Sequence, residues 1–222
     1  MFVLNGKDIE RVENELHLGN YFGAKSFQLQ EAKNVKDIYV KFNLLLAQFS
    51  NVNVDIKYKL FKSFCMSVYG AQLWNFESTV CNRFYIAWRK CVKRLFRLPH
   101  RTHTCILNFV LEDMPIDVQL HCRFGRFLNS CLESNNDLIR IVSNTALVNP
   151  LSNLSKSTNY VCHRYGINKQ CKDFYGFIKS TYHAGISDDN LKQGMFIKDL
   201  LRLHDNCPDN DIFDIVDYLC CK

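Results

Sequence analysis

Residues 88–103 read Trp-Arg-Lys-Cys-Val-Lys-Arg-Leu-Phe-Arg-Leu-Pro-His-Arg-Thr-His, the most informative stretch of the chain. It holds six of the 28 Lys and Arg residues of the 222-residue chain. On a helix, with about 100° between successive residues, its cations fall on one side and its apolar side chains on the other. The sequence therefore predicts an amphipathic helix over residues 79–98, which ends before Pro99 because proline disfavours helical backbone at the preceding residue.

The two sides of this predicted helix differ in what they can contact. The cations on one side are Arg83, Arg89, Lys90, Lys93, Arg94 and Arg97. The apolar residues on the other side are Phe84, Trp88, Cys91, Val92 and Leu95. A helix of this kind buries one face in a core and offers the other to something negative, for which phosphate is the leading candidate. The alternative is that the charges only keep the face solvated, as most surface charges do.

Charge is unevenly distributed along the chain, whose formal net charge is +6. Residues 36–101 carry twelve basic and three acidic side chains, whereas the segments before and after them have net charges of −1 and −2. Like charges one helical turn apart, such as Lys90 and Arg94, destabilise an isolated helix by roughly a few tenths of a kcal/mol per pair. Binding to a polyanion explains why the chain tolerates them, and contact with an acidic segment of the same chain explains it as well.

The eleven cysteines are scattered along the chain, and their number is odd. Several of them occupy apolar positions of predicted helices: Cys65, Cys91, Cys122 and Cys131. No signal peptide is recognisable at the start, and no apolar run approaches the ~20 residues that cross a bilayer. The sequence therefore predicts an intracellular protein, cytoplasmic or nuclear, with no membrane segment and with reduced thiols that pack as small hydrophobic groups.

The hydrophobic pattern predicts a mainly α fold, a helical bundle preceded by a short N-terminal β-hairpin. Phe2-Val3-Leu4, the turn pair Asn5-Gly6 and the apolar positions up to Val12 predict the hairpin, and residues 16–19 a third short strand. Helices are predicted over residues 28–49, 55–73, 79–98, 115–131, 136–147, 170–182, 188–203 and 209–220. The last of these is acidic, and the polar stretch 149–157 is the predicted linker.

The predicted helix over residues 55–73 adds one cation to the candidate site. Asp55 is placed to cap its first turn. Its predicted buried face comprises Leu60, Phe61, Phe64, Cys65, Val68 and Leu73. Lys59 and Lys62 fall together on another face, which is therefore expected to meet solvent.

Three segments carry a family resemblance. They are Leu16-His17-Leu18-Gly19-Asn20, the segment Tyr-Lys-Leu-Phe-Lys-Ser-Phe-Cys-Met-Ser-Val-Tyr-Gly-Ala-Gln-Leu-Trp from Tyr58 to Trp74, and the block from Ala87-Trp88-Arg89-Lys90 to Leu98-Pro99-His100-Arg101-Thr102-His103. In order and spacing they resemble the C-terminal part of the reverse transcriptases of non-LTR (LINE-type) retrotransposons, over roughly residues 1–140. In that family the Leu-Gly motif lies where the palm passes into the thumb, a helical bundle that grips the template–primer duplex.

The resemblance implies three regions and a missing catalytic centre. Residues 1–23 are expected to be a palm-edge β-hairpin, residues 24–148 a thumb and linker helical bundle, and residues 149–222 a C-terminal helical tail. A polymerase palm needs paired aspartates and a third aspartate that hold two Mg²⁺ ions. The chain has one Asp-Asp pair, Asp188-Asp189, and it follows Gly185-Ile186-Ser187, a context typical of a helix cap. We therefore expect no polymerase catalysis and no other enzymatic activity.

Histidines and cysteines occur together in two places, and neither has the pattern of a metal site. His100, His103 and Cys105 lack a fourth zinc ligand and a Cys-x-x-Cys partner. The second group is Cys162, His163, Cys171, His183, His204, Cys207, Cys220 and Cys221. It lacks the Cys-x2-Cys-x4-His-x4-Cys spacing of the zinc knuckle that related elements can carry. The sequence therefore predicts no metal and no cofactor, and we expect Arg101 and the Thr102 hydroxyl to contact phosphate instead.

Five aromatic side chains near the basic segment have two possible roles. They are Tyr58, Phe61, Tyr69, Trp74 and Trp88. Stacking on bases is one role, but their periodicity favours packing in the core.

The favoured hypothesis is a non-catalytic fragment of a retrotransposon RNA-directed DNA polymerase that binds template–primer or element RNA by its phosphates. The residues predicted to carry the binding are Lys62, Arg89, Lys90, Lys93, Arg94, Arg97 and Arg101. The expected partner is RNA or an RNA/DNA duplex, and the oligomeric state stays open. The alternative is a helical protein-interaction module, a domesticated or decayed remnant without a nucleic-acid role. Its basic face would meet an acidic protein or the chain's own C-terminal helix.

Overall fold

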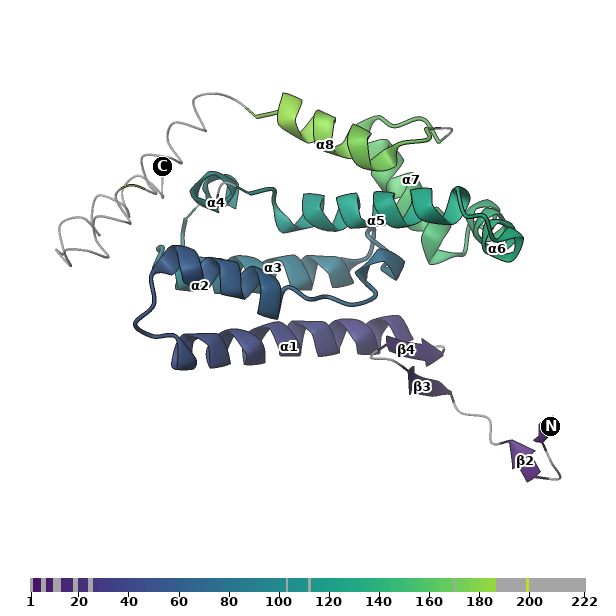
Figure 1. Ribbon diagram of the computed structural model, residues 1–222, viewed down its shortest axis with the longest axis horizontal. Coiled ribbons are helices and arrows are strands. Elements are labelled where there is room, and N and C mark those ends of the chain that lie inside the picture. The colour runs from purple at the N-terminus through teal and green to yellow at the C-terminus, as the bar shows by residue number, and fades with distance from the viewer. Residues whose placement is uncertain are drawn as a thin grey trace.

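The computed structural model describes residues 2–4, 7–9, 13–17, 20–23, 26–102, 104–111, 113–169, 171–186 and 199. Over these residues the fold is mainly α-helical, as predicted (Figure 1). The predicted helices over residues 188–203 and 209–220 lie outside the described residues, Asp199 apart, as do Asp188-Asp189 and His103.

Two short antiparallel strand pairs precede the helices. β1 (Phe2–Leu4) pairs with β2 (Lys7–Ile9), with Phe2 opposite Ile9, which confirms the predicted hairpin. β3 (Asn14–His17) pairs with β4 (Asn20–Gly23), with Asn14 opposite Gly23. The sequence predicts a strand near β3 but not its partner β4, which lies against α1.

The helices stack in layers (Figure 1). α1 (Ser26–Gln48) forms the first layer, α2 (Val54–Leu60) and α3 (Thr79–Leu95) the second, α5 (Ile116–Leu132) the third and α8 (Phe174–Ala184) the fourth. α4 (Thr104–Leu111) lies at one end of the stack, and α6 (Asp137–Val148) and α7 (Asn153–Tyr165) lie at the other. No helix in the described part of the chain is long and apolar enough to cross a membrane.

The prediction of one helix over residues 55–73 is correct for its first turns, which form α2, and wrong beyond them. α2 passes into a π-helical turn, η1 (Phe61–Cys65), and a short 3-10 turn, η2 (Ala71–Leu73), follows Gly70, whose φ is +74°. A π turn inserts an extra residue, so the apolar spacing no longer matches one helical face. Phe64 and Leu73, which the sequence predicts to be buried, are exposed.

The helix starts also differ from the prediction in two places. Asn53, not Asp55, caps α2: its side-chain Oδ1 accepts a hydrogen bond from the backbone N–H of Asp55 at 2.8 Å. α7 begins inside the predicted linker, because the Ser152 hydroxyl oxygen accepts from the backbone N–H of Ser155 at 3.0 Å and so caps the helix. The sequence also misses α4 altogether.

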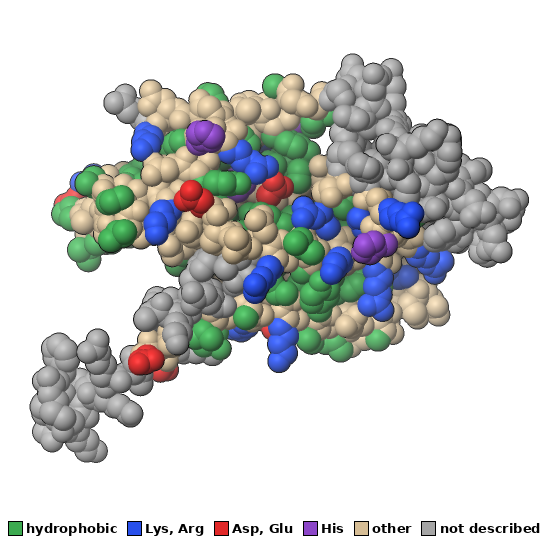
Figure 2. All heavy atoms as spheres, turned by 180° about the vertical axis from the view of Figure 1, so that it is seen from behind, with side chains coloured by type: hydrophobic (Ala, Val, Ile, Leu, Met, Phe, Trp, Pro, Cys, Tyr) green, Lys and Arg blue, Asp and Glu red, His purple; other side chains and the backbone are tan. Residues whose placement is uncertain are grey.

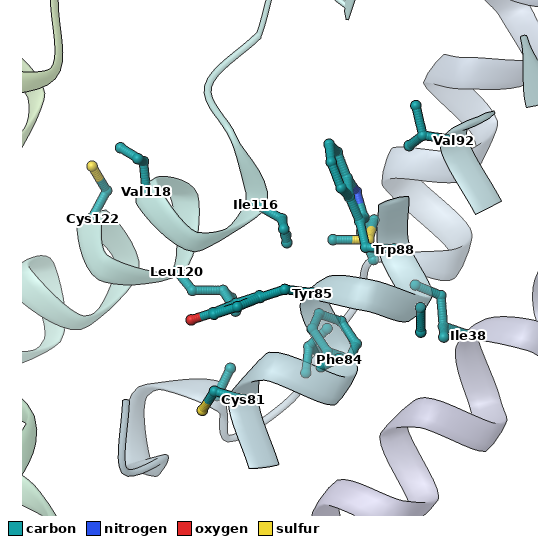
Figure 3. Close-up of a cluster of buried hydrophobic side chains, with 14 of the residues drawn as sticks. Ile38, Cys81, Phe84, Tyr85, Trp88, Val92, Ile116, Val118, Leu120 and Cys122 are labelled. Atoms are coloured by element: carbon teal, nitrogen blue, oxygen red, sulfur yellow. The ribbon is translucent and has the colours of Figure 1, made fainter. Parts of the chain in front are cut away.

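One cluster of buried side chains joins the layers (Figure 3). Its largest fully buried members include Phe42, Phe61, Phe84, Leu107, Phe124, Leu128, Phe174 and Ile178. The cluster is continuous across residue 149, where the sequence predicts a boundary, because α7 and α8 contribute Val161 and Ile178 to it.

The aromatic residues and cysteines mostly occupy this core. Tyr58, Phe61, Trp74 and Trp88 are buried, as their periodicity predicts, whereas Tyr69 is exposed. The described cysteines are free thiols. Cys65, Cys91 and Cys122 are buried and Cys131 is half-buried, so they pack as small hydrophobic groups.

A buried hydroxyl ties α7 to the segment between η2 and α3. The Ser157 Oγ donates to the Trp74 carbonyl oxygen at 2.6 Å and accepts from the Phe76 N–H at 3.3 Å. Both backbone groups therefore find their partner on a helix that lies far away in the sequence.

Candidate nucleic-acid interface

α3 turns one face to the core and the other to solvent. Its buried residues are Cys81, Phe84, Tyr85, Ala87, Trp88, Cys91, Val92 and Leu95. Arg83, Lys90 and Arg94 are exposed, and Arg89 and Lys93 are half-buried. Because the core fixes the inward face, these cations are held on the outward side. Figure 2 shows Lys and Arg side chains gathered over one part of the surface.

The end of α3 places Arg97 differently from the helical wheel. The helix ends at Leu95, and Arg97 adopts a left-handed backbone conformation with φ +51°. The N–H of Leu98 donates to the Lys93 carbonyl oxygen at 2.8 Å, which closes the last turn in the manner of a Schellman motif. Arg97 is exposed. It stays at the cationic end of α3, but the cap rather than the helical period sets its position.

The loop after α3 is tied down by its own polar groups. The Lys93 Nζ donates to the His100 carbonyl oxygen at 2.8 Å. Thr102 is buried, and its hydroxyl donates to the Pro99 carbonyl oxygen at 2.7 Å. The expectation that the Thr102 hydroxyl contacts phosphate is therefore wrong, since that hydroxyl closes a turn. Arg101 is exposed in the same loop.

α1 supports Arg94 and contributes a further cation. The Arg94 Nη1 donates to the Asn43 Oδ1 at 3.1 Å, and the guanidinium carbon lies 5.8 Å from the centre of the Phe42 ring. Lys41, which is not among the predicted binding residues, places its Nζ 3.2 Å from the Ser67 Oγ and donates to it. The only sequence signal for Lys41 is its place inside the basic segment 36–101.

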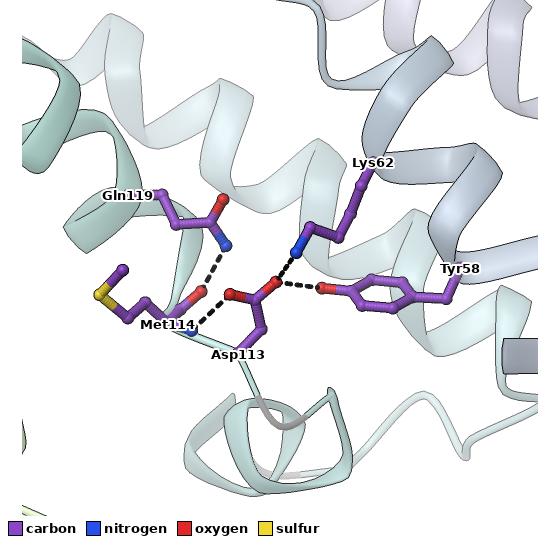
Figure 4. Close-up of polar contacts among 5 residues, drawn as sticks. All are labelled: Tyr58, Lys62, Asp113, Met114 and Gln119. Carbon is purple, nitrogen blue, oxygen red and sulfur yellow. Dashed lines mark hydrogen bonds and ion pairs between the residues drawn. The ribbon is translucent and has the colours of Figure 1, made fainter.

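Lys62 is held by a carboxylate (Figure 4). It forms an ion pair with Asp113, whose Oδ2 also accepts from the Tyr58 hydroxyl at 3.3 Å. The Asp113 Oδ1 accepts from the Met114 N–H at 2.9 Å, and the Gln119 Nε2 donates to the Met114 carbonyl oxygen at 2.6 Å. Burial, followed by the nearby Asp113 carboxylate, raises the pKa of Tyr58. This network joins α2 and η1 to the start of α5, so Lys62 already has a negative partner.

The cations of α3 differ from Lys62 in this respect. The ion pairs between described residues are Lys62–Asp113, Arg140–Asp137 and Arg164–Asp117. Within the same part of the chain, no carboxylate forms an ion pair with Arg89, Lys90, Arg94, Arg97 or Arg101. Three of these residues lie on the outward side of α3 and two follow its end, and among the described residues none of the five is paired with a carboxylate; we call this set the α3 basic face. Lys93 borders it.

Metal-binding geometry is not found in the described part of the chain: no three His, Cys, Asp or Glu side chains there are grouped to hold a metal ion.

Comparison with known proteins identifies no relative. No protein-family model, no curated protein and no solved structure matches the chain. The relation to non-LTR reverse transcriptases therefore stays a prediction that rests on three sequence segments.

Proposed function

We propose that the α3 basic face binds the phosphate backbone of RNA or of an RNA/DNA duplex, without reading sequence and without catalysis. In this proposal the chain is the thumb and linker part of a non-LTR reverse transcriptase. The observation that carries it is the set of outward cations without a described carboxylate partner, on a helix whose opposite face is fixed in the core. Cations held in this way attract phosphates and release their counterions.

The helix dipole explains only part of this charge. Cations in the last turn of a helix are stabilised by the partial negative charge there, which accounts for Lys93 and Arg94. The dipole effect is confined to the last turn, so it does not account for Arg89 and Lys90, which precede that turn, or for Arg101, which lies in the loop beyond it. A binding role explains all of them together.

Salt dependence tests the proposal. We expect the purified chain to bind a fluorescent RNA/DNA duplex of about 20 bp with a log–log salt slope near −3 to −4, if about four cations each neutralise a phosphate. Between roughly 50 and 200 mM salt, the affinity should then fall about 150-fold. An affinity that stays constant over this range contradicts the proposal.

A matched pair of variants tests which surface binds. Lys90→Glu/Arg101→Glu reverses two exposed cations of the α3 basic face, and Lys172→Glu/Lys179→Glu makes the same change in net charge on the exposed surface of α8 and the turn before it. We expect the first variant to lose most of its affinity for all duplex sequences and about two units of salt slope. Equal losses in both variants would mean that net charge alone, and no particular face, governs binding.

A protein-interaction module is the second candidate function, and one observation favours it: the exposed aliphatic side chains of α6. If the α3 basic face binds an acidic protein, poly-glutamate should displace the labelled duplex at equal charge concentration. If the face binds nucleic-acid phosphates, the duplex should remain bound, because the guanidinium and ammonium groups meet a higher linear charge density on the nucleic acid than on poly-glutamate.

A further inference from the structure

α6 leaves an aliphatic stripe in water. We call Leu138, Ile141, Val142 and Val148 the α6 stripe; their exposed fractions are 68%, 62%, 59% and 83%. At about 100° per residue they lie within an arc of about 120°. On the other side of the helix, Ser143 is buried and Leu147 half-buried against the rest of the bundle. α6 therefore uses only part of its apolar surface within the chain.

The stripe has a size typical of a binding patch. Its four residues leave on the order of 450 Å² of surface in water, within the range for the largest patch of a soluble monomer, which is often functional. Two such surfaces in contact remove about 900 Å², the size of a weak, reversible interface. The area is thus sufficient for a weak dimer that forms at micromolar concentrations.

The chemistry of the stripe suits a second copy of itself. Leu138, Ile141, Thr145 and Val148 recur at alternating three- and four-residue steps, the spacing at which two helices pack side by side. The charged residues of α6 are Asp137 and Arg140, which pair with each other. A neutral stripe neither repels its own copy nor attracts a charged partner.

We propose that the α6 stripe packs against the same stripe of a second copy about a two-fold axis, so that the chain forms a homodimer. Figure 1 places α6 at the opposite end of the molecule from α4, which follows the cationic end of α3. A dimer formed through α6 therefore leaves the α3 basic face of both copies open. The dimer does not depend on the proposed function, because none of its contacts involves that face.

Sedimentation equilibrium of the purified full-length chain, from about 1 to 200 µM, tests the dimer. We expect a concentration-dependent monomer–dimer equilibrium. Ile141→Glu should raise the dimer dissociation constant at least about 100-fold, since a carboxylate on the axis is buried without a partner. Leu44→Glu makes the same kind of change at an outward position of α1, where Leu44 is 47% exposed, and should leave the dissociation constant unchanged.

A charge-swap experiment identifies the occupant as a second copy. Ile141→Lys should dissociate the dimer as Ile141→Glu does, and mixing the two variants should restore dimers, because unlike charges then face each other across the axis. The melting temperature of each variant should match that of the native chain when both are monomeric, since the side chain points to solvent. A native chain that is monomeric over the whole concentration range, or a dimer that Leu44→Glu dissociates and Ile141→Glu does not, overturns the proposal. A monomer that binds an added amphipathic helix from another protein overturns it too.

Discussion

α3 and α6 both lie at the surface, and they differ in what they leave in water. α3 buries its apolar residues and exposes cations, whereas α6 exposes most of its aliphatic residues and buries few. Hydrated cations are stable in water, but an aliphatic surface of this size gains free energy when another surface covers it. The outward residues of α3 are therefore stable in water without a further contact, whereas those of α6 are stabilised when a second surface covers them.

The largest expected effect separates the inward residues of α3 from the outward residues of α6. Trp88→Ala removes a side chain that is 2% exposed and should lower the free energy of unfolding by about 3–5 kcal/mol. Leu138→Ala, measured at a concentration where the chain is monomeric, should change it by less than about 0.5 kcal/mol. Urea denaturation of both variants measures the difference. Similar losses would show that Leu138 is packed within the monomer, in the same way as Trp88.

The core that holds both helices should weaken in acid. α3 and α6 both contact α5, where His121 is fully buried with its Nδ1 2.9 Å from the Tyr165 hydroxyl oxygen and its ring against Phe76. Burial, followed by the charge of Arg164, which is itself paired with Asp117, lowers the pKa of His121 to about 3.

Because the folded-state pKa lies below the unfolded value of about 6.5, only the unfolded chain binds this proton between those values. The stabilising effect of a neutral His121 is therefore complete above pH about 6.5, and it falls by roughly 1.4 kcal/mol per pH unit below that. Denaturation at pH 7.5 and 5.5 should show this loss in the native chain and not in His121→Gln, beyond the changes common to both. An equal acid response of the two proteins would assign the titration to other groups.

Within the basic segment, residues with and without a carboxylate partner should contribute unequally. Lys90→Gln should weaken duplex binding about threefold to tenfold and reduce the salt slope by about one unit. Lys62→Gln should have a smaller effect, because Lys62 must first give up Asp113. Anisotropy titrations at several salt concentrations measure both. If Lys62 contributes as much as Lys90, its ion pair opens in the complex and the α3 basic face extends to η1.

Arg97 should show the smallest effect and separate binding from stability. Its φ of +51° is costly for a residue with a Cβ and free of strain for glycine. Arg97→Gly should therefore raise the free energy of unfolding by about 0.5–1 kcal/mol while it weakens duplex binding. Arg97→Ala serves as the control, since it removes the same charge without relieving the backbone. Thermal unfolding of the two variants should differ, and their duplex affinities should agree.

The sequence predicts those parts of the fold that depend on neighbours along the chain. The apolar period of α3 is a local signal, and it places the cations of the helix on the correct side, although the helix ends at Leu95 and not, as predicted, at residue 98. The same reasoning fails at Phe64 and Leu73, because the π turn of η1 shifts the period and leaves no mark in composition. It also misses α7, where a run of polar residues is typical of a linker but includes the capping Ser152.

The site is predictable only in part for a similar reason. That Arg89, Lys90 and Arg94 share a helix follows from their spacing. That Lys62 meets Asp113 follows from nothing nearby, since 51 residues separate them. Thr102 lies inward, and its hydroxyl closes a turn with Pro99. This contact is short-range, but the basic residues around Thr102 favour the different prediction of a phosphate contact.

Ser157 determines which parts of this chain can be removed without disturbing the rest. Its single hydroxyl serves the Trp74 carbonyl oxygen and the Phe76 N–H, 83 and 81 residues earlier in the chain. Removal of the part of the chain after α6, for example by truncation at the loop before α7, would leave both backbone groups without their partner at the entrance to α3. The loop at Pro150 is exposed, but a fragment that ends there loses the Ser157 hydroxyl. A fragment that retains α3 therefore needs α7 as well.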